Sequence, residues 1–280
     1  MPYAQVLTTA FKTSLAGGAF ADTLAAASGD SLAVANYNTG GARVLEAWAI
    51  DSASVLEISW LYTRPESTHD QQRGVRRMVP GTTYGGVGAR GALPLLGGAE
   101  TIDLYKSDTA TITVSGTAAD AVVMSYVIEY DDLPGASAVF INAAQAQGLQ
   151  KSALGIRCDA VASATVGQYG ATRAINADDD RLHANTWYAI LGWTTQIAVC
   201  TVSMIGPDWG GQRIGGPAGV LGQQSDTWFL DQSIKWGQKP LIPCFNSNNK
   251  GNILLQVADD AVSTSPKIDL SLYELTGQPG

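Results

Sequence analysis

The chain resembles itself at a fixed spacing, and this feature constrains its fold more than any other. The tetrapeptide AWAI at 47–50 is followed 140 residues later, half of the 280-residue length, by WYAI at 187–190. Further matches keep the same order along the chain: AVAN (33–36) with RAIN (173–176), QRG (72–74) with QRI (212–214), YKS (105–107) with FNS (245–247), ADAV (119–122) with DDAV (259–262) and, with a slip of one residue, KTSLAG (12–17) with KSALG (151–155). Such self-similarity is the signature of a repeated unit. We predict a tandem duplication, with one domain at 1–135 and another at 136–280.

Strand signals dominate both halves. Short segments that are rich in β-branched and aromatic residues, and are bounded by turn residues, occur at 43–50, 54–62, 100–105, 110–116 and 122–130, and again at 186–193, 197–205, 226–232, 239–245, 252–257 and 267–275. Helices are expected only at 4–16 and 141–154, too few for the crossovers of parallel sheets. We therefore predict an all-β protein of two tandem antiparallel β-sandwiches with a few short helices. Each sandwich is expected to be a jelly roll, with a generic Greek-key sandwich as the alternative.

Two long segments rich in Gly and Pro follow matching strands, at 63–98 and 206–226. Long loops in compact domains tend to be functional. In a duplicated sandwich, equivalent loops leave the same end of each unit. We therefore expect these two loops to form similar contact surfaces.

The charge pattern excludes several partners. Charged residues make up 15% of the chain and the net charge is -8, whereas nucleic-acid binding needs clustered Lys and Arg. The one basic cluster, Arg73 to Arg77, is interpreted as a solvated loop or an interface. No apolar run approaches the roughly 18 residues of a membrane span, and the N-terminus lacks the basic start of a signal peptide. We expect a soluble protein, made in a reducing cytoplasm, whose neutral surface faces other protein.

The residues that usually carry chemistry are few and scattered. His69 lies beside Asp70, but no G-x-S-x-G nucleophile motif accompanies it. His183 follows the triplet Asp178 to Asp180, which lacks the regularly spaced ligands of a calcium loop and is interpreted as a solvated acidic turn. We predict no catalytic residue and no enzyme activity.

Metal and cofactor signatures are equally weak. Cys158, Cys200 and Cys244 show no CxxC spacing and are expected to be buried small hydrophobes. The glycine-rich runs at 85–91 and 210–216 lack the GK[ST] ending of a phosphate loop. We predict no metal site and no cofactor.

Tryptophans separate two further interpretations. Trp48, Trp60, Trp187 and Trp228 lie within strand patterns and are expected in the core. Trp209 and Trp236 lie in apparent turns, where exposure would suit a subunit interface or a glycan site.

Two tandem jelly-roll-like halves with long Gly/Pro loops and no catalytic constellation resemble the double jelly-roll major capsid proteins of tailless bacterial and other viruses. The resemblance implies that three copies form a trimer of six similar barrels, a pseudo-hexameric capsomer that tiles an icosahedral shell. It also implies location in the virion, assembly in the host cytoplasm, and contacts with other virion proteins. The first half of one chain is then expected to meet the second half of its neighbour, with Arg73, Arg76 and Arg77 paired to acidic residues such as Asp178 to Asp180.

Two other classes of function remain open on the residues alone. A phage decoration, head-fibre or tail structural protein would share this composition and strand pattern. A carbohydrate-binding β-sandwich would instead present exposed aromatic platforms beside polar side chains.

Overall fold

A computed structural model describes residues 3–51, 57–63, 73–78, 102–135, 139–195, 199–218, 225–259 and 266–279. The strands of the first half are β1 (Ala4–Lys12), β2 (Gly18–Thr23), β3 (Ala25–Ala26), β4 (Ala42–Asp51), β5 (Glu57–Thr63), β6 (Arg73–Met78), β7 (Ile102–Leu104), β8 (Thr109–Gly116) and β9 (Val122–Tyr130). Those of the second half are β10 (Phe140–Ile141), β11 (Gln150–Asp159), β12 (Arg173–Ala174), β13 (Trp187–Thr195), β14 (Val199–Ile205), β15 (Arg213–Ala218), β16 (Ile242–Asn246), β17 (Leu254–Ala258) and β18 (Lys267–Leu275). The helices are α1 (Ala143–Leu149), α2 (Trp228–Lys235) and the 3₁₀ turns η3 (Pro207–Trp209) and η4 (Ser247–Asn252). The predicted all-β class is confirmed.

Each half contains two antiparallel sheets, and the strand order is the same in both. In the first half the orders are β3-β1-β9-β4-β7 and β2-β8-β5-β6. In the second half they are β11-β18-β13-β16-β10 and β12-β17-β14-β15. Without the two-residue strands β3 and β10, every strand has a counterpart of the same rank in the other half. Both the predicted jelly roll and the alternative Greek-key sandwich build two sheets from non-consecutive strands.

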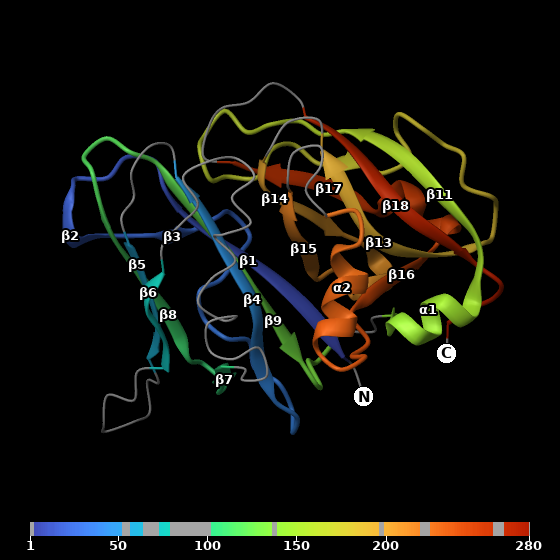
Figure 1. The fold of residues 1–280 in the computed structure, drawn as a ribbon, viewed down its shortest axis with the longest axis horizontal. Helices are drawn as coiled ribbons and strands as arrows, with labels where there is room; N and C mark the ends of the chain where they lie inside the picture. Colours follow the sequence, from blue (N-terminus) through green and yellow to red (C-terminus); the bar gives the residue numbers. More distant parts are fainter. Residues whose placement is uncertain are drawn as a thin grey trace.

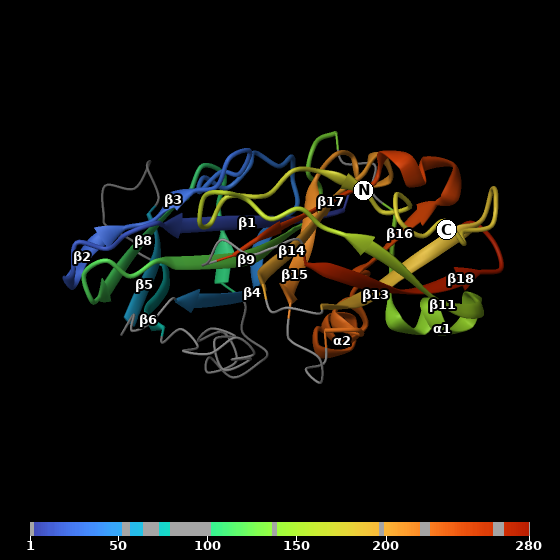
Figure 2. The ribbon, with the colours of Figure 1, turned by 90° about the horizontal axis from the view of Figure 1, so that it is seen from above.

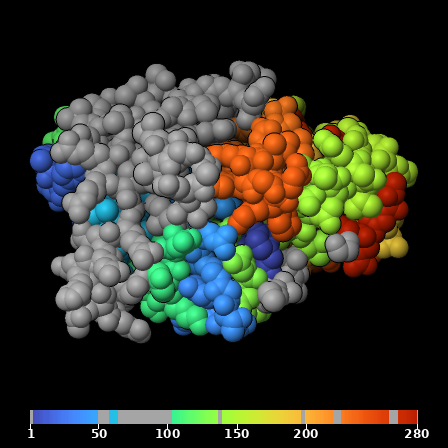
Figure 3. Space-filling view, turned by 60° about the horizontal axis from the view of Figure 1, so that its bottom comes forward, coloured from blue at the N-terminus to red at the C-terminus, as the bar shows by residue number. Residues whose placement is uncertain are grey.

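The two halves lie side by side, with β1, β4 and β9 of the first half next to β14 and β15 of the second (Figure 1). Seen from above, the molecule is elongated, and α1 and α2 lie along one side of the second half (Figure 2). The surface of the α2 segment lies between the first half and the α1 segment (Figure 3). Helix α2 also contacts the first half, where Trp228 packs on Trp48 with ring centroids 5.7 Å apart.

Each half has its own core. In the first, Trp60 and Tyr62 of β5 pack against Tyr126 of β9, with ring centroids of Trp60 and Tyr126 4.9 Å apart. In the second, Tyr188 of β13 stacks on Phe245 of β16 at 5.6 Å. All five rings are fully buried. Aromatic burial of this size supplies much of the stabilisation of a sandwich core.

The prediction of a helix at 4–16 is wrong, because residues 4–12 form strand β1. Ala4 and Ala10 face the first core, while Leu7 packs in the cluster that contains the second core. Both faces of β1 are therefore buried, so the hydrophobic alternation that identifies a half-exposed strand is missing. The helix predicted at 141–154 is confirmed only over Ala143–Leu149, where an Asn142–Gln145 capping box begins it. It gives way to β11 at Gln150.

Two expectations for the second half are also wrong. The strand predicted at 226–232 is helix α2, whose buried residues Trp228, Phe229, Gln232 and Ser233 recur at helical spacing. A short apolar run with two aromatic residues fits either structure, and local pattern does not decide between them. The loop predicted at 206–226 contains strand β15, which pairs with β14. The matching stretch 63–98 contains strand β6, and its remainder lies largely outside the described residues.

The AWAI/WYAI match falls on strands of the same rank, β4 and β13, without aligning their residues. Trp48 of β4 points away from the first core and donates a hydrogen bond to the carbonyl of Cys200 in the second half. Tyr188 of β13, its partner in the AWAI/WYAI match, lies inside the second core. Lys12 ends β1, whereas Lys151 lies near the start of β11. At this match, the offset of 140 residues therefore joins strands of the same rank but not side chains with the same role.

Candidate functional site: the contact between the two sandwiches

The outward face of sheet β1-β9-β4 is buried against the second half. Along β9, Val122, Met124 and Tyr126 face the first core, and Val123 and Val127 belong to the cluster of the second. Opposite them lies sheet β12-β17-β14-β15. At Gly215 of β15, an added Cβ would come within 2.8 Å of Leu7 and 2.1 Å of the Val202 carbonyl. Glycine is required here mainly by the backbone of β14, the neighbouring strand of the same sheet, and it also leaves room for Leu7 of β1.

Hydroxyl groups occupy the centre of the contact. Ser125 of β9 hydrogen-bonds Thr9 of β1 at 2.8 Å and Thr201 of β14 at 2.7 Å. Thr9 also bonds the hydroxyl of Tyr169 at 2.7 Å, and Trp48 donates its indole N–H to Thr201 at 3.1 Å. Thr9, Ser125 and Thr201 are fully buried. Because each hydroxyl has its partner in a neighbouring strand, the chain of bonds fixes how the two sheets sit on each other.

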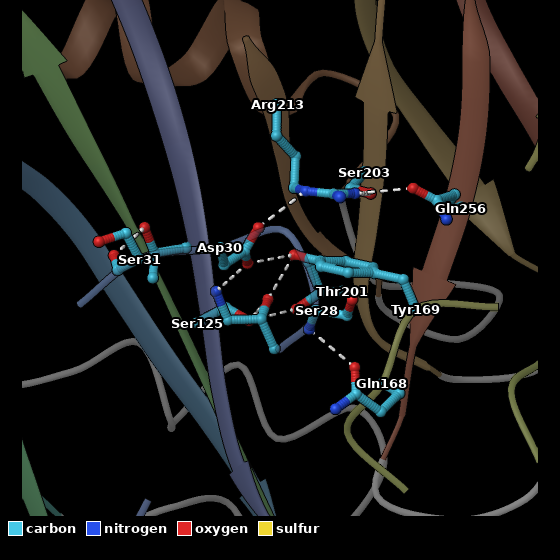
Figure 4. Close-up of polar contacts among 12 residues, drawn as sticks. Ser28, Asp30, Ser31, Ser125, Gln168, Tyr169, Thr201, Ser203, Arg213 and Gln256 are labelled. Atoms are coloured by element: carbon cyan, nitrogen blue, oxygen red, sulfur yellow. Dashed lines mark hydrogen bonds and ion pairs between the residues drawn. The ribbon is translucent and has the colours of Figure 1, made fainter. Parts of the chain in front are cut away.

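An ion pair extends this network (Figure 4). The guanidinium Nε of Arg213 lies 2.9 Å from Oδ1 of Asp30, and the two side chains are 11% and 2% exposed. Asp30 Oδ2 accepts hydrogen bonds from the Thr9 amide at 2.7 Å and from Tyr169 at 3.1 Å. Burial raises the pKa of the Asp30 carboxyl above its usual value, and Arg213 acts in the opposite direction. The carboxylate thus depends on Arg213 to offset its loss of water.

Arg213 is itself held from several sides. Its Nη1 donates to Ser203 at 3.0 Å and to Gln256 at 2.8 Å. Its guanidinium carbon lies 3.8 Å from the centre of the Tyr169 ring, a cation–π contact. A cavity of about 240 Å³ beside Asp30 and Arg213 is lined by residues of both halves, among them Val6, Tyr130 and Ile205. The ion pair is therefore part of one wall of this cavity.

A second set of charges lies where α2 meets the first half. Glu46 of β4 and Glu129 of β9 are almost fully buried. Lys235 of α2 pairs with Glu46, and Lys239 just beyond α2 pairs with Glu129. Arg43 adds a contact to Glu129 at 3.2 Å. The carboxylates of the first half are thus neutralised largely by cations of the second, an arrangement that disfavours their separation.

Each carboxylate of the predicted acidic turn forms an ion pair with a cation of the second half. Asp178 pairs with Arg173, Asp179 with Arg181, and Asp180 with Lys250. The pairing expected between this triplet and the arginines of β6 has no counterpart among the described contacts, because the side chains of Arg73, Arg76 and Arg77 lie outside the described residues. It stays a prediction.

The other candidate residues do not converge. His69 lies outside the described residues. The ring Nδ1 of His183 is 3.3 Å from Glu274, and the His183 side chain is 70% exposed. Cys158, Cys200 and Cys244 are free thiols and buried, as expected. Burial raises the pKa of Cys158 to about 12, so this thiol stays protonated and inert at neutral pH.

Across the described residues, no group of three His, Cys, Asp or Glu side chains is placed to hold a metal ion. In the same part of the chain, none of the helices has the length and apolar character to cross a membrane.

Among the tryptophans, Trp48, Trp60 and Trp228 are buried as predicted, and Trp187 is partly buried and packs on the second core. Trp209, whose place in an apparent turn left exposure open, is not exposed. It has 0% exposure, and its indole N–H donates to the carbonyl of Cys244. Trp236 is half-buried, with its N–H on Gln232. The Trp209 ring therefore offers no open face for stacking on a sugar.

Sequence reasoning missed the residues that make the contact. Arg213 was noticed only as the repeat partner of Arg73, while Asp30, Ser125 and Tyr169 carried no motif. Their partners lie far away in sequence, so no local spacing brings them together. One signal was present: serine at position 125, within a largely apolar strand, where a buried hydroxyl needs a partner.

No protein-family model and no curated protein matches the chain. Among solved structures, it is similar to the major capsid protein P2 from bacteriophage PM2, with 9% sequence identity and a TM-score of 0.21 over 99% of each chain. A likeness of this degree does not by itself assign a fold or a function.

Proposed function

We propose that this chain is a viral structural protein: a major capsid protein whose paired jelly rolls trimerise into pseudo-hexameric capsomers of an icosahedral shell. The observation that carries the proposal is the repetition of one strand order in both halves, combined with a buried contact that holds the halves together. The proposal places the protein in the virion, with copies of itself as its main partner and assembly in the host cytoplasm. It assigns no enzyme activity.

The physical reason concerns symmetry. Six similar positions around a capsomer can be occupied by three copies of a fused pair, provided that the two units of the pair are rigidly connected. Heterologous contacts between such pairs form a ring when the rotation closes. The Asp30–Arg213 pair and the Glu46–Lys235 pair supply the rigidity here, because separation would leave buried charges without partners.

The burial of tryptophan counts against the carbohydrate-binding alternative. Stacking on a sugar needs an exposed aromatic face, and Trp209 is fully buried. Among the described residues, the large hydrophobic side chains that are exposed are Tyr105, Val161 and Ile234, which come from separate segments of the fold. They do not form an aromatic platform.

Electron microscopy tests the proposal. The purified protein, concentrated under conditions that favour assembly, is expected to form closed shells of uniform size, and antibodies to it should label the shell itself in native virions. Labelling confined to fibres, tails or knobs on a shell of another protein would contradict the capsid role and favour the decoration or tail role. Absence from virions, combined with retention on a glycan array, would favour the carbohydrate-binding role.

A further inference from the structure

We infer that the cavity beside Asp30 and Arg213 is a binding site for a small neutral acyl group, that is, a carbonyl attached to a short branched alkyl chain. The inference goes beyond the capsid role and does not depend on it. It rests on the position and walls of the cavity, on a hydrogen-bond donor of Arg213 that faces no partner, and on the balance of charge inside the cavity.

The cavity opens to solvent where a loop of the first half meets a turn of the second. Ser31, Ala33 and Ala35 of the loop line the cavity and are exposed, as is Gly211 of the turn. The volume of about 240 Å³ exceeds the roughly 150 Å³ of an engineered apolar cavity that binds benzene. A ligand of that size therefore fits, and it can enter without separation of the two halves.

Aliphatic side chains form much of the wall. Val6 and Leu7 of β1 and Ile128 of β9 come from the first half, and Ile205 at the end of β14 comes from the second. Val6 and Ile205 are only partly buried. An alkyl group in the cavity removes this remaining apolar surface from water, which favours its binding.

Arg213 offers a hydrogen-bond donor to this space. Its Nε and Nη1 donate to Asp30, Ser203 and Gln256 (Figure 4), whereas its Nη2 has no partner in the described part of the chain. Gly29 lines the same cavity, and a Cβ at this position would lie 3.5 Å from Nη2. Glycine therefore leaves the nitrogen uncovered, and a carbonyl oxygen that enters the cavity can accept its hydrogen bond.

The charge inside the cavity favours a neutral ligand. Among the described residues that line it, Asp30 and Arg213 are the two that carry charge, and they pair with each other at 2.9 Å. A carboxylate ligand would lose its hydration and bring a second negative charge beside Asp30, whereas a neutral carbonyl avoids both costs. The half-buried amide of Gln212, which also lines the cavity, can accept a hydrogen bond from an N–H of the ligand. An amide therefore suits the cavity better than an acid of the same shape.

A carbonyl beside a branched alkyl chain occurs in free amides and also in the leucine residues of peptides. Isovaleramide serves as the probe for a free amide, and N-acetylleucine methylamide as the probe for a residue within a peptide. Both carry the same isobutyl group and a neutral carbonyl. The probe that binds more tightly identifies the source of the ligand, and binding of either one supports the site.

Saturation-transfer NMR with the full chain measures the dissociation constants. Isovaleramide should bind saturably with roughly millimolar affinity, and isovalerate, the acid of the same shape, at least about tenfold more weakly. Arg213→Lys keeps a cation beside Asp30 but removes Nη2, and the loss of one hydrogen bond should weaken isovaleramide binding about tenfold.

Two further variants test the location. Ala33→Phe places a ring at the mouth of the cavity and should weaken isovaleramide binding at least about tenfold. Ala164→Phe, at an exposed position outside the cavity, is the matched control and should bind like the unaltered protein. Far-ultraviolet circular dichroism verifies that each variant folds.

Three results would overturn the inference: no saturable binding of either amide probe, tighter binding of isovalerate than of isovaleramide, or unchanged binding in both Ala33→Phe and Arg213→Lys. Each of these results leaves the proposed function standing, because shell formation is measured separately.

Discussion

The two halves share one strand order, yet the outward faces of their equivalent sheets differ. In the first half, β1 and β9 direct Leu7, Thr9 and Ser125 into the contact with the second half, where all three are buried. In the second half, β11 directs Ala153 and Gly155 to solvent. The inward residues of both sheets are apolar and build separate cores. The inward side chains therefore specify the fold, and the outward side chains specify the neighbour.

Charge pairs show the same contrast. Arg213 and Asp30, at the contact, are almost fully buried and linked to several further groups. Arg157 and Asp269, on the outward side of strands β11 and β18, have comparable hydrogen-bond distances but are 52% and 44% exposed. Similar hydrogen-bond distances therefore make different contributions to stability, because only the Arg213–Asp30 pair is shielded from solvent.

The largest expected effect comes from breaking the buried pair. Arg213→Met leaves the Asp30 carboxylate without a cation, and we expect a loss of about 3–5 kcal/mol in the free energy of unfolding measured with denaturant. Arg157→Met, which removes the exposed pair with Asp269, is the matched control and should lower the free energy of unfolding by less than about 1 kcal/mol. Equal losses for the two variants would break the comparison.

The pH dependence of the same variant sharpens the result. Burial already raises the pKa of Asp30, and removal of Arg213 takes away an interaction that lowers this pKa. At low pH the carboxyl is protonated and needs no cation. The deficit of Arg213→Met relative to the unaltered protein should therefore shrink as the pH falls, and a deficit that is constant down to acid pH would show that Asp30 is not its cause.

A smaller effect is expected at the glycines. Gly215→Val places atoms where Leu7 and the Val202 carbonyl lie, and overpacking of this kind costs about 1–3 kcal/mol. Gly155→Ala meets no atom closer than 3.9 Å and should change the free energy of unfolding by less than about 0.5 kcal/mol. Thermal and denaturant unfolding of both variants measure the difference. Similar stability of the two would mean that β15 does not pack against β14 and Leu7 as closely as the structure shows.

The smallest effect concerns a carboxylate of the second half. A hydrogen bond from Lys151, aided by Ser152, lowers the pKa of Glu274 from its ordinary value of 4.5 to about 2. Its contribution to stability is present above pH 4.5 and is lost as the pH falls toward 2. Glu274→Gln should remove this acid-dependent loss, and its cost at neutral pH should be smaller than the pKa shift alone implies, because Lys151 is exposed and water screens the pair. An unchanged acid unfolding profile would contradict the assignment.

The sequence predicts where several of the strands begin and end. The segments 122–130 and 267–275 were predicted with the bounds that the structure has, because one or both faces of each strand have a clear apolar pattern. Strand β1 was missed because the contact between the halves buries its second face, and helix α2 because it packs in that same contact. The errors therefore cluster where tertiary contacts override the local pattern.

The residues of the candidate site could not be predicted from the sequence, for a related reason. Asp30 and Arg213 lie in different halves, and each looks like an ordinary surface residue in its own segment. Their pairing depends on how two finished sandwiches dock. Self-similarity predicts that two such units exist, but it does not indicate which sheet of one meets which sheet of the other.

The mass of the purified protein in solution at micromolar concentration tests the central claim most directly. Sedimentation equilibrium or light scattering should give three times the chain mass of 29.3 kDa, or larger closed assemblies built from that unit. A stable monomer at every concentration, with no trimers and no shells, would contradict the account.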